Sequence, residues 1–271
     1  MSNFTTKTTS MRNLLFLLSA SMLLIACNNA DNKTADAAKN TDLIQQNLKG
    51  KVHRLEESSS TIDSAGATKP DSSSYINEFD EKGYQTSYVT NDINGKTKEE
   101  QAIEHYEGGQ VKGFVTKNAQ GKQTLKWEIT IDSSGKYNGA KVFDSTGKLS
   151  SVWKELEEND YGQVTRGTEY KEDGSLKSSF VNNYDNAHYI GGLSKDSTGK
   201  ETYHSSITLN DKGDPSEEST TTVTKDTSKT EKFTYKYDNY DDKGNWIQRT
   251  SYNEKGKPVK VIKRTITYYK D

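Results

Sequence analysis

Apolar and polar residues alternate along much of the chain after Gly50. Every second residue of the stretches 125–131, 203–209 and 233–237 is mostly apolar or aromatic, and the residues between them are polar or charged. A period of two is typical of a strand with one apolar face and one wet face. No stretch after Gly50 shows the 3.6-residue period of an amphipathic helix, so the pattern predicts β-strands.

A short phrase separates these strands: a hydrophobic residue, Asp or Asn, two further residues and Gly, as in Phe79-Asp80…Gly83. The side chain of Asp or Asn starts a tight turn by forming hydrogen bonds with the nearby backbone. Gly ends the turn, at a position where φ is positive. Every second turn returns with a period of about 26 residues, as at Gly83, Gly109 and Gly135, which is a period typical of repeat architectures. Two turns, at 184–187 and 226–229, are predicted without glycine. The predicted turn glycines are Gly66, Gly83, Gly95, Gly109, Gly121, Gly135, Gly147, Gly162, Gly174, Gly199, Gly213, Gly244 and Gly256.

The repeat predicts an all-β fold, a long antiparallel meander of about 14–16 short strands. Side by side at about 4.8 Å, such strands would form a flat sheet roughly 70 Å wide. Because strand twist accumulates, we expect a curled or twisted single-layer repeat sheet with its apolar residues on the concave side. A two-layer sandwich is the alternative.

An open sheet has two edges, and each needs protection from pairing with another chain. The last strand, 257–269, carries Lys260, Lys263 and Arg264, which fits an exposed edge. The first strand, near 51–59, is expected to be covered by a short helix at 42–48. Asp42 and Gln45 resemble a capping box for that helix, and Gly50 supplies its stop.

Composition narrows the class of protein. Only 30% of the 271 residues are hydrophobic even with tyrosine included, which predicts a thin core. Disorder is the competing interpretation, but 10% aromatic residues and a net charge of −2 favour a folded chain. The near-balanced charge argues against nucleic acid as a partner.

The N-terminus resembles a bacterial lipoprotein leader. Arg12 precedes an apolar run from Leu14 to Ala26, and this run ends at Cys27, the only cysteine. The predicted domains are a signal peptide at 1–26, a lipid-anchored tether with a short helix at 27–50 and a β-repeat domain at 51–271. Cys27 is the predicted lipid-attachment residue, which makes a membrane the first partner and the outer membrane the expected location. An ordinary secretory signal is the alternative to the lipoprotein leader. Whether translation starts at Met1 or at Met11 is left open by the sequence.

The repeat itself resembles a known family. The stretches 237–246 and 252–257, with the cores at 79–83 and 143–147, look like the YD (Rhs-type) repeats of bacterial surface proteins and toxin shells. The likeness extends over residues 51–271 and is close to small lipoproteins of Bacteroidetes-type bacteria. It implies a long antiparallel sheet that spirals. Many units lack the first Tyr, and the period here is longer than in tight Rhs repeats, so a closed toxin shell is not implied.

Three aromatic residues occupy equivalent positions, six residues after a turn glycine: Trp127, Trp153 and Phe180. They lie on alternate strands, which predicts roughly 10 Å between neighbours. One interpretation is a ligand platform for sugar or peptide, since exposed aromatic surface usually marks a partner. The other is core packing, which a repeat produces without any site.

The remaining candidates for chemistry favour structural roles. Glu128, Glu155 and Glu157 are expected on a solvated strand face rather than in a hydrolytic pair. Asp238, Asp241 and Asp242 lack the spacing of an EF-hand loop. The four histidines, His53, His105, His188 and His204, have no metal-ligand spacing. We therefore predict no catalytic residue, no metal and no cofactor.

The sequence thus predicts a lipid-anchored binding or scaffold module of the bacterial envelope, without enzyme activity, that contacts a protein or glycan partner. Carbohydrate capture by the aromatic residues and a toxin-immunity role are the two alternatives.

Overall fold

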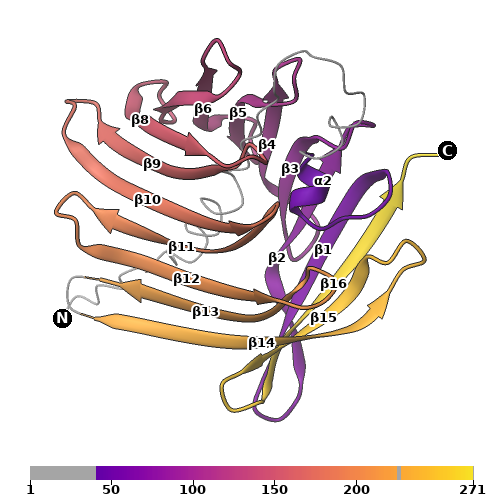
Figure 1. Ribbon diagram of the computed structural model, residues 1–271. Coiled ribbons are helices and arrows are strands. Elements are labelled where there is room, and N and C mark those ends of the chain that lie inside the picture. The colour runs from indigo at the N-terminus through magenta and orange to yellow at the C-terminus, as the bar shows by residue number, and fades with distance from the viewer. Residues whose placement is uncertain (1–40, 225–226, 271) are drawn as a thin grey trace, which may run out of the picture.

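The computed structural model describes residues 41–224 and 227–270, which form one short helix and sixteen β-strands (Figure 1). The helix is α2 (Asp42–Gln45). The strands are β1 (Val52–Ile62), β2 (Thr68–Phe79), β3 (Gln85–Asp92), β4 (Thr97–His105), β5 (Val111–Asn118), β6 (Gln123–Ile131), β7 (Tyr137–Phe143), β8 (Leu149–Glu158), β9 (Val164–Lys171), β10 (Leu176–Asp185), β11 (His188–Asp196), β12 (Glu201–Leu209), β13 (Pro215–Val223), β14 (Ser228–Tyr240), β15 (Trp246–Asn253) and β16 (Pro258–Tyr268).

The predicted turn chemistry is confirmed. All thirteen predicted glycines have positive φ, between 68° and 90°. At the turn between β2 and β3, the Oδ1 of Asp80 accepts bonds from the backbone nitrogens of Lys82 and Tyr84, each at 2.9 Å. In the turn predicted without glycine at 184–187, Asn186 takes the left-handed conformation with φ 53°. Asn tolerates this region better than other non-glycine residues.

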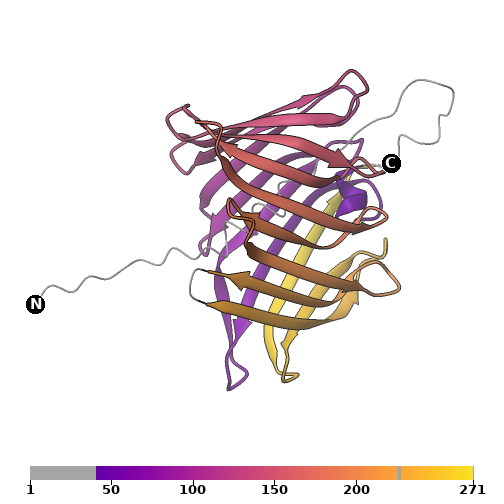
Figure 2. The ribbon, with the colours of Figure 1, turned by 60° about the vertical axis from the view of Figure 1, so that its left-hand side comes forward.

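The strands close into a barrel, so the predicted open single-layer sheet is wrong, and so is the two-layer sandwich. Each strand pairs with its neighbours in sequence, and β1 also pairs with β16 from Val52↔Tyr268 to Thr61↔Lys260. Figure 2 shows the orange strands of one wall in front of the indigo and yellow strands that complete the ring. Accumulated twist, which makes a wide sheet curl, here brings the first and last strands together, and closure removes both edges.

Closure also overturns the two edge predictions. Arg264 does not protect an edge, because its Nε lies 3.0 Å from Glu57 Oε1 on β1. Lys260 likewise lies 2.9 Å from Asp71 on β2. The first strand needs no covering helix, since β16 occupies that side of it.

The two faces of the barrel wall differ in exposure. On β14, Phe233, Tyr235 and Tyr237 are half-buried, whereas Thr234 and Lys236 between them are exposed. Because side chains crowd on the concave side of a curved sheet, we assign the less exposed set to the inside of the ring and the other set to the outside. Buried apolar residues gather in two places on the wall, one around Trp153 on β5–β10 and one around Leu55 next to α2. Within the described residues, no helix has both the length and the apolarity needed to cross a membrane.

Candidate ligand-binding surfaces

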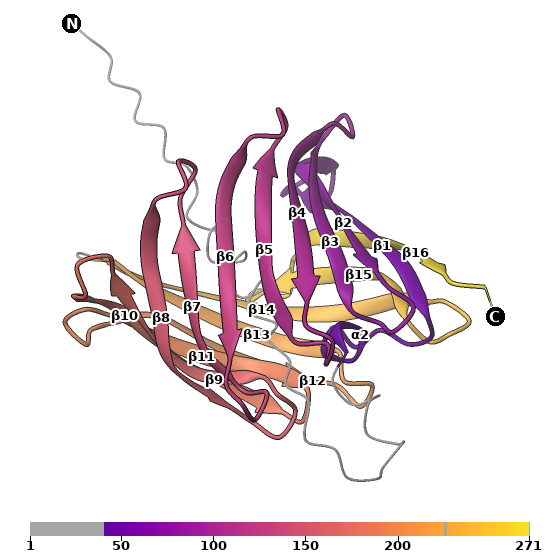
Figure 3. The ribbon, with the colours of Figure 1, turned by 90° about the horizontal axis from the view of Figure 1, so that it is seen from above.

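The segment 41–50, called the strap below, crosses one end of the barrel from one wall to the other. Figure 3 shows α2 between the ends of β4 and β12. Three sets of hydrogen bonds hold the strap: Asp42 Oδ2 to the Gln85 nitrogen (2.6 Å), Asn47 Nδ2 to Asp214 Oδ1 (2.7 Å), and Asn245 Oδ1 and Nδ2 to the Lys49 backbone (2.8 and 2.9 Å). Because Gln85 begins β3 whereas Asp214 and Asn245 precede β13 and β15, the strap ties together walls distant in the barrel order.

The strap does not use the predicted capping box. The N-cap residue of α2 is Thr41, which makes no side-chain capping bond. The carboxylate of Asp42 is 2% exposed and bonds to the sheet instead. A short helix is present as predicted, but it covers only Asp42–Gln45. The prediction that Gly50 stops the helix is wrong, because the helix ends at Gln46 and the left-handed residue that follows is Asn47, with φ 53°.

At the opposite end of the barrel, called the open end below, the turns of the described residues are exposed to solvent. Every second turn lies there, and a Cβ added to their glycines would meet nothing within 4 Å; these are Gly66, Gly95, Gly121, Gly147, Gly174, Gly199 and Gly256. At the strap end, a Cβ on Gly83 would lie 3.0 Å from Leu43, and one on Gly213 would lie 3.4 Å from Asn47. Successive turns therefore lie alternately at the strap end, where they are packed, and at the opposite end, where they face solvent.

A sequence signal for this difference was present and was missed. At the open end the residue after the turn glycine is often lysine, as in Lys96, Lys122, Lys148, Lys200 and Lys257, and it is exposed. At the strap end the corresponding residues include Gln110, Gln163, Asp214 and Asn245, which are at most 4% exposed.

The inner face is polar and rich in tyrosine. Tyr75 and Tyr88 stack with centroids 5.9 Å apart, and the Tyr235 hydroxyl donates to Glu218. Burial raises the pKa of Tyr189 and of Tyr237 to about 12, so both hydroxyls stay protonated at neutral pH. A ring of sixteen strands is wide enough to enclose a water-filled interior, called the lumen below.

Trp127, Trp153 and Phe180 lie together on the inner face and form a ladder. Ring centroids are 6.1 Å apart between Trp127 and Trp153 and 5.4 Å apart between Trp153 and Phe180. Phe114, which sequence reasoning missed, extends the ladder at 5.5 Å from Trp127. It lies directly opposite Trp127 across the β5–β6 hairpin, so counting back from Gly121 could have found it.

The rings are closer together than the strand spacing predicted, because small residues occupy the strands between them. Ala140 on β7 pairs with Trp153, and Gly167 on β9 pairs with Phe180. A Cβ on Gly167 would lie 2.6 Å from the Phe180 ring, so the ring leans over that strand. With Trp153 at 4% exposure and Phe180 at 8%, the ladder has the burial of a core.

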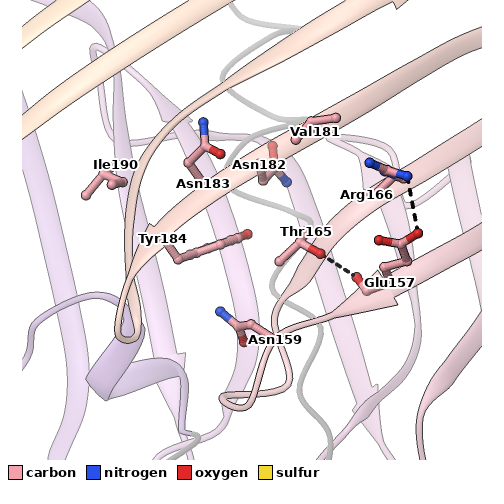
Figure 4. A pocket seen from close by; sticks show the side chains of 9 residues that line it. All are labelled: Glu157, Asn159, Thr165, Arg166, Val181, Asn182, Asn183, Tyr184 and Ile190. Atoms are coloured by element: carbon pink, nitrogen blue, oxygen red, sulfur yellow. Dashed lines mark hydrogen bonds and ion pairs between the residues drawn. The ribbon is translucent and has the colours of Figure 1, made fainter.

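An open hollow of about 590 Å³ lies across β8–β11 (Figure 4). Arg166 lies in the middle of the hollow, and its cross-strand neighbours are Glu157 and Val181. The Arg166–Glu157 ion pair spans 3.3 Å and both side chains are more than half exposed, which places this row on the outer face. Amides of Asn159, Asn182 and Asn183 and the ring of Tyr184 complete the lining, together with Thr165 and Ile190. The hollow is wide open to solvent and is lined mainly by polar residues.

The other acidic candidates occupy structural positions. Glu128, Glu155 and Glu157 are exposed, and Glu155 sits at φ 56° in a bulge of β8. Asp241 opens a turn and accepts bonds from the Lys243 and Asn245 nitrogens. Among residues 41–224 and 227–270, no group of three His, Cys, Asp or Glu side chains is arranged to hold a metal ion. Cys27 lies outside the described residues.

The barrel has a known counterpart. It is similar to a porin-like protein from Bacteroides uniformis, with TM-score 0.52 and 14% identity over 80% of this chain and 96% of that one. A porin-like protein from Bacteroides vulgatus (TM-score 0.40, 8% identity, 78% of this chain and 97% of that one) is less similar. A TcdB2–TccC3–Cdc42 structure (TM-score 0.29, 12% identity) matches 75% of this chain and 15% of its own. No protein-family model matches the sequence, and no curated protein matches it significantly.

The likeness to the porin-like protein from Bacteroides uniformis concerns the fold alone. The exposure of apolar side chains on the outer surface is a separate property of this barrel. Among the described residues only three large apolar side chains are exposed: Ile93 at 59%, Leu176 at 38% and Val181 at 37%. Barrels that span an outer membrane carry an outward apolar band about 25 Å tall, flanked by aromatic girdles. Outward positions such as Thr234 and Lys236 are polar.

Proposed function

We propose that this protein is a non-catalytic binding module of the bacterial envelope, held to a membrane by a lipid on Cys27, with the barrel outside the bilayer. Its ligand enters the lumen through the open end. The observation that carries this proposal is the difference between the two ends: the strap crosses one, and the turns of the other face solvent. A pore needs two open ends, whereas a barrel crossed at one end is suited to holding a ligand.

The polar outer wall supports the same proposal. An outward face with three exposed large apolar residues gains little from burial in lipid, and charged side chains on it would lose solvation. The leader supplies membrane attachment without insertion, because Cys27 follows an apolar run of signal-peptide length. The resemblance of the turns to YD repeats remains a prediction, and the proposed function does not depend on it.

Fractionation of cells that express the full chain tests the proposal. Wild-type protein should incorporate a palmitate analogue and stay with the membranes. Replacing Leu24–Cys27 by the Ala-x-Ala site of an ordinary secretory signal should abolish labelling and release a folded, soluble protein. Asn29→Ser is the matched control and should keep both the label and the membrane location. A barrel that resists alkaline extraction from membranes after the lipobox is replaced would contradict the proposal.

Carbohydrate capture is a second candidate, favoured by the outer hollow rather than by the aromatic ladder. Arg166 and Asn183 lie on neighbouring strands of the hollow and supply hydrogen-bond donors and an acceptor. A glycan array probed with the full-length protein should then give signals that Arg166→Ala and Asn183→Ala both remove. Lys232→Ala, at an exposed position on β14, should leave them unchanged. Equal signals from all three variants would exclude the hollow as the sugar site.

A further inference from the structure

Arg249 is the exception among the arginines of the barrel. Residues 41–224 and 227–270 contain four arginines, and three form ion pairs: Arg54 with Glu56 and Glu78, Arg166 with Glu157, and Arg264 with Glu57. No carboxylate in that part of the chain forms an ion pair with Arg249, and its buried Nε has no acceptor. A partly buried cation without a counter-ion is costly, so the position calls for an anion.

Aromatic rings hold the Arg249 guanidinium in place on the inner face. Its Cζ lies 4.5 Å from the centroid of Tyr235 and 5.2 Å from that of Trp246. The hydroxyl of Tyr237 interacts with Arg249 and donates to the Pro215 carbonyl at 2.6 Å. Rings that fix a guanidinium reduce the entropy lost when it binds a ligand.

The acidic side chains nearby are already engaged. Glu57 pairs with Arg264, Glu218 accepts from Tyr235, and Asp214 accepts from Asn47 of the strap. Arg264 adds a second positive charge: its Cζ is 3.4 Å from the Trp246 centroid, and it is repelled electrostatically by Arg249. The two cations therefore share one indole ring, and only one of them has its own carboxylate.

The site lies near the strap end of the lumen, called the floor of the lumen below. Trp246 begins β15 directly after Asn245, which bonds to the strap, and Arg249 follows three residues further into the barrel. Arg249 pairs across the sheet with Ile262, whose apolar side chain offers no competing acceptor.

We propose that Arg249 binds the carboxylate of a small organic acid, such as an acidic sugar, at the floor of the lumen. The inference rests on the proposed binding role of the lumen and names its ligand class. It does not depend on the lipid anchor, so failure of the fractionation experiment and failure of the experiment below are distinguishable.

Isothermal titration of the full-length protein tests the site. The probes are D-glucuronate and D-galacturonate, their uncharged counterparts D-glucose and D-galactose, and inorganic phosphate. We expect the two uronates to bind at least tenfold more tightly than the neutral sugars and than phosphate, with an affinity that falls as NaCl is raised. Equal binding of charged and neutral sugars, tighter binding of phosphate, or no uronate binding would overturn the proposal.

Variants then assign the binding to Arg249. Arg249→Gln should weaken uronate binding at least tenfold, and Arg249→Lys, which keeps the charge but loses the planar edge, should also weaken it. Ile262→Glu supplies a carboxylate opposite Arg249 from within the chain and should abolish binding while the barrel stays folded by circular dichroism. Lys232→Gln, which removes a positive charge at an exposed position on β14, should bind as the wild type does. Full uronate affinity in folded Arg249→Lys and Ile262→Glu proteins would refute the assignment.

Discussion

The Oδ2 atom of Asp42 lies 2.6 Å from the backbone nitrogen of Gln85, and both residues are buried. This bond joins the N-terminal strap to the start of β3. It is one of the contacts that make the two ends of the barrel different.

Asp42→Ala should therefore loosen the strap. Loss of a buried bond to a charged acceptor costs about 1.5–3 kcal/mol, so we expect faster amide exchange at Gln85 and in the strap, with smaller changes at the open end. Hydrogen exchange with mass spectrometry measures both regions in one experiment. Glu104→Ala, an exposed acidic position, is the control. Unchanged exchange at the strap would mean that Asp42 does not hold it.

Closure of the barrel can be tested by a cross-strand disulfide. Ser58 on β1 is paired with Lys263 on β16, and both are exposed. In a Cys27→Ser background, which leaves no other cysteine, Ser58→Cys with Lys263→Cys should oxidise rapidly within one chain, because directly opposite residues are within disulfide reach. Mass spectrometry and non-reducing electrophoresis identify the link. Ser58→Cys with Lys232→Cys should not link, since β14 is not a neighbour of β1. An open sheet would show no difference between the two pairs.

The aromatic ladder should act as a core element. Trp153→Ala removes a ring that is 4% exposed and contacts Trp127 and Phe180, so we expect a loss of about 3–5 kcal/mol in the free energy of unfolding. Gly167→Ala should also destabilise, by about 1–3 kcal/mol, because its Cβ would meet the Phe180 ring at 2.6 Å. Urea unfolding measures both. Leu176→Ala, at a 38% exposed position, is the control. Stability losses equal to that of the control would favour an exposed platform.

Stability should decrease as pH rises from about 4.5 to about 7. Burial raises the pKa of Glu158 from its ordinary 4.5 to about 7, and this carboxyl accepts a 2.5 Å bond from the Tyr137 nitrogen. The folded state then binds more protons than the unfolded state in this window, so its extra stability is complete below pH 4.5 and is lost as pH passes 7. Because Glu158 is only partly buried, the effect should be on the order of 1 kcal/mol.

Urea midpoints measured from pH 4.5 to 8 test this dependence. Glu158→Gln should flatten the part of the profile that Glu158 causes, whereas Glu104→Gln should preserve it. A Glu158→Gln profile with the wild-type slope would show that other groups cause the pH dependence.

Local chemistry was predictable from local sequence. The Asp80 turn follows from Asp and Gly at fixed offsets, because both residues act through backbone atoms a few positions away. The alternation on β14 follows from the two-residue period of a strand, whichever larger structure that strand joins. The sixteen strands likewise fall within the predicted range of 14–16.

Long-range relationships were not predictable in this way. The open sheet and the barrel share the same hairpins and differ only in the pairing of β1 with β16, the first and last strands of the chain that the structure describes. That pairing depends on twist and tilt summed over every strand, and no short pattern encodes the sum. The ion pair between Glu57 on β1 and Arg264 on β16 shows the same limit, because only closure of the ring brings these two strands together.

The sequence by itself thus determined the strands, their turns and their antiparallel order, since these depend on backbone preferences and side-chain alternation over a few residues. Tertiary structure alone decided that the sheet closes, that the strap crosses one end, and that polar groups from distant strands share a lumen. The physical reason is that closure exchanges two exposed edges for one more set of backbone hydrogen bonds, a gain that exists only once all sixteen strands are in place.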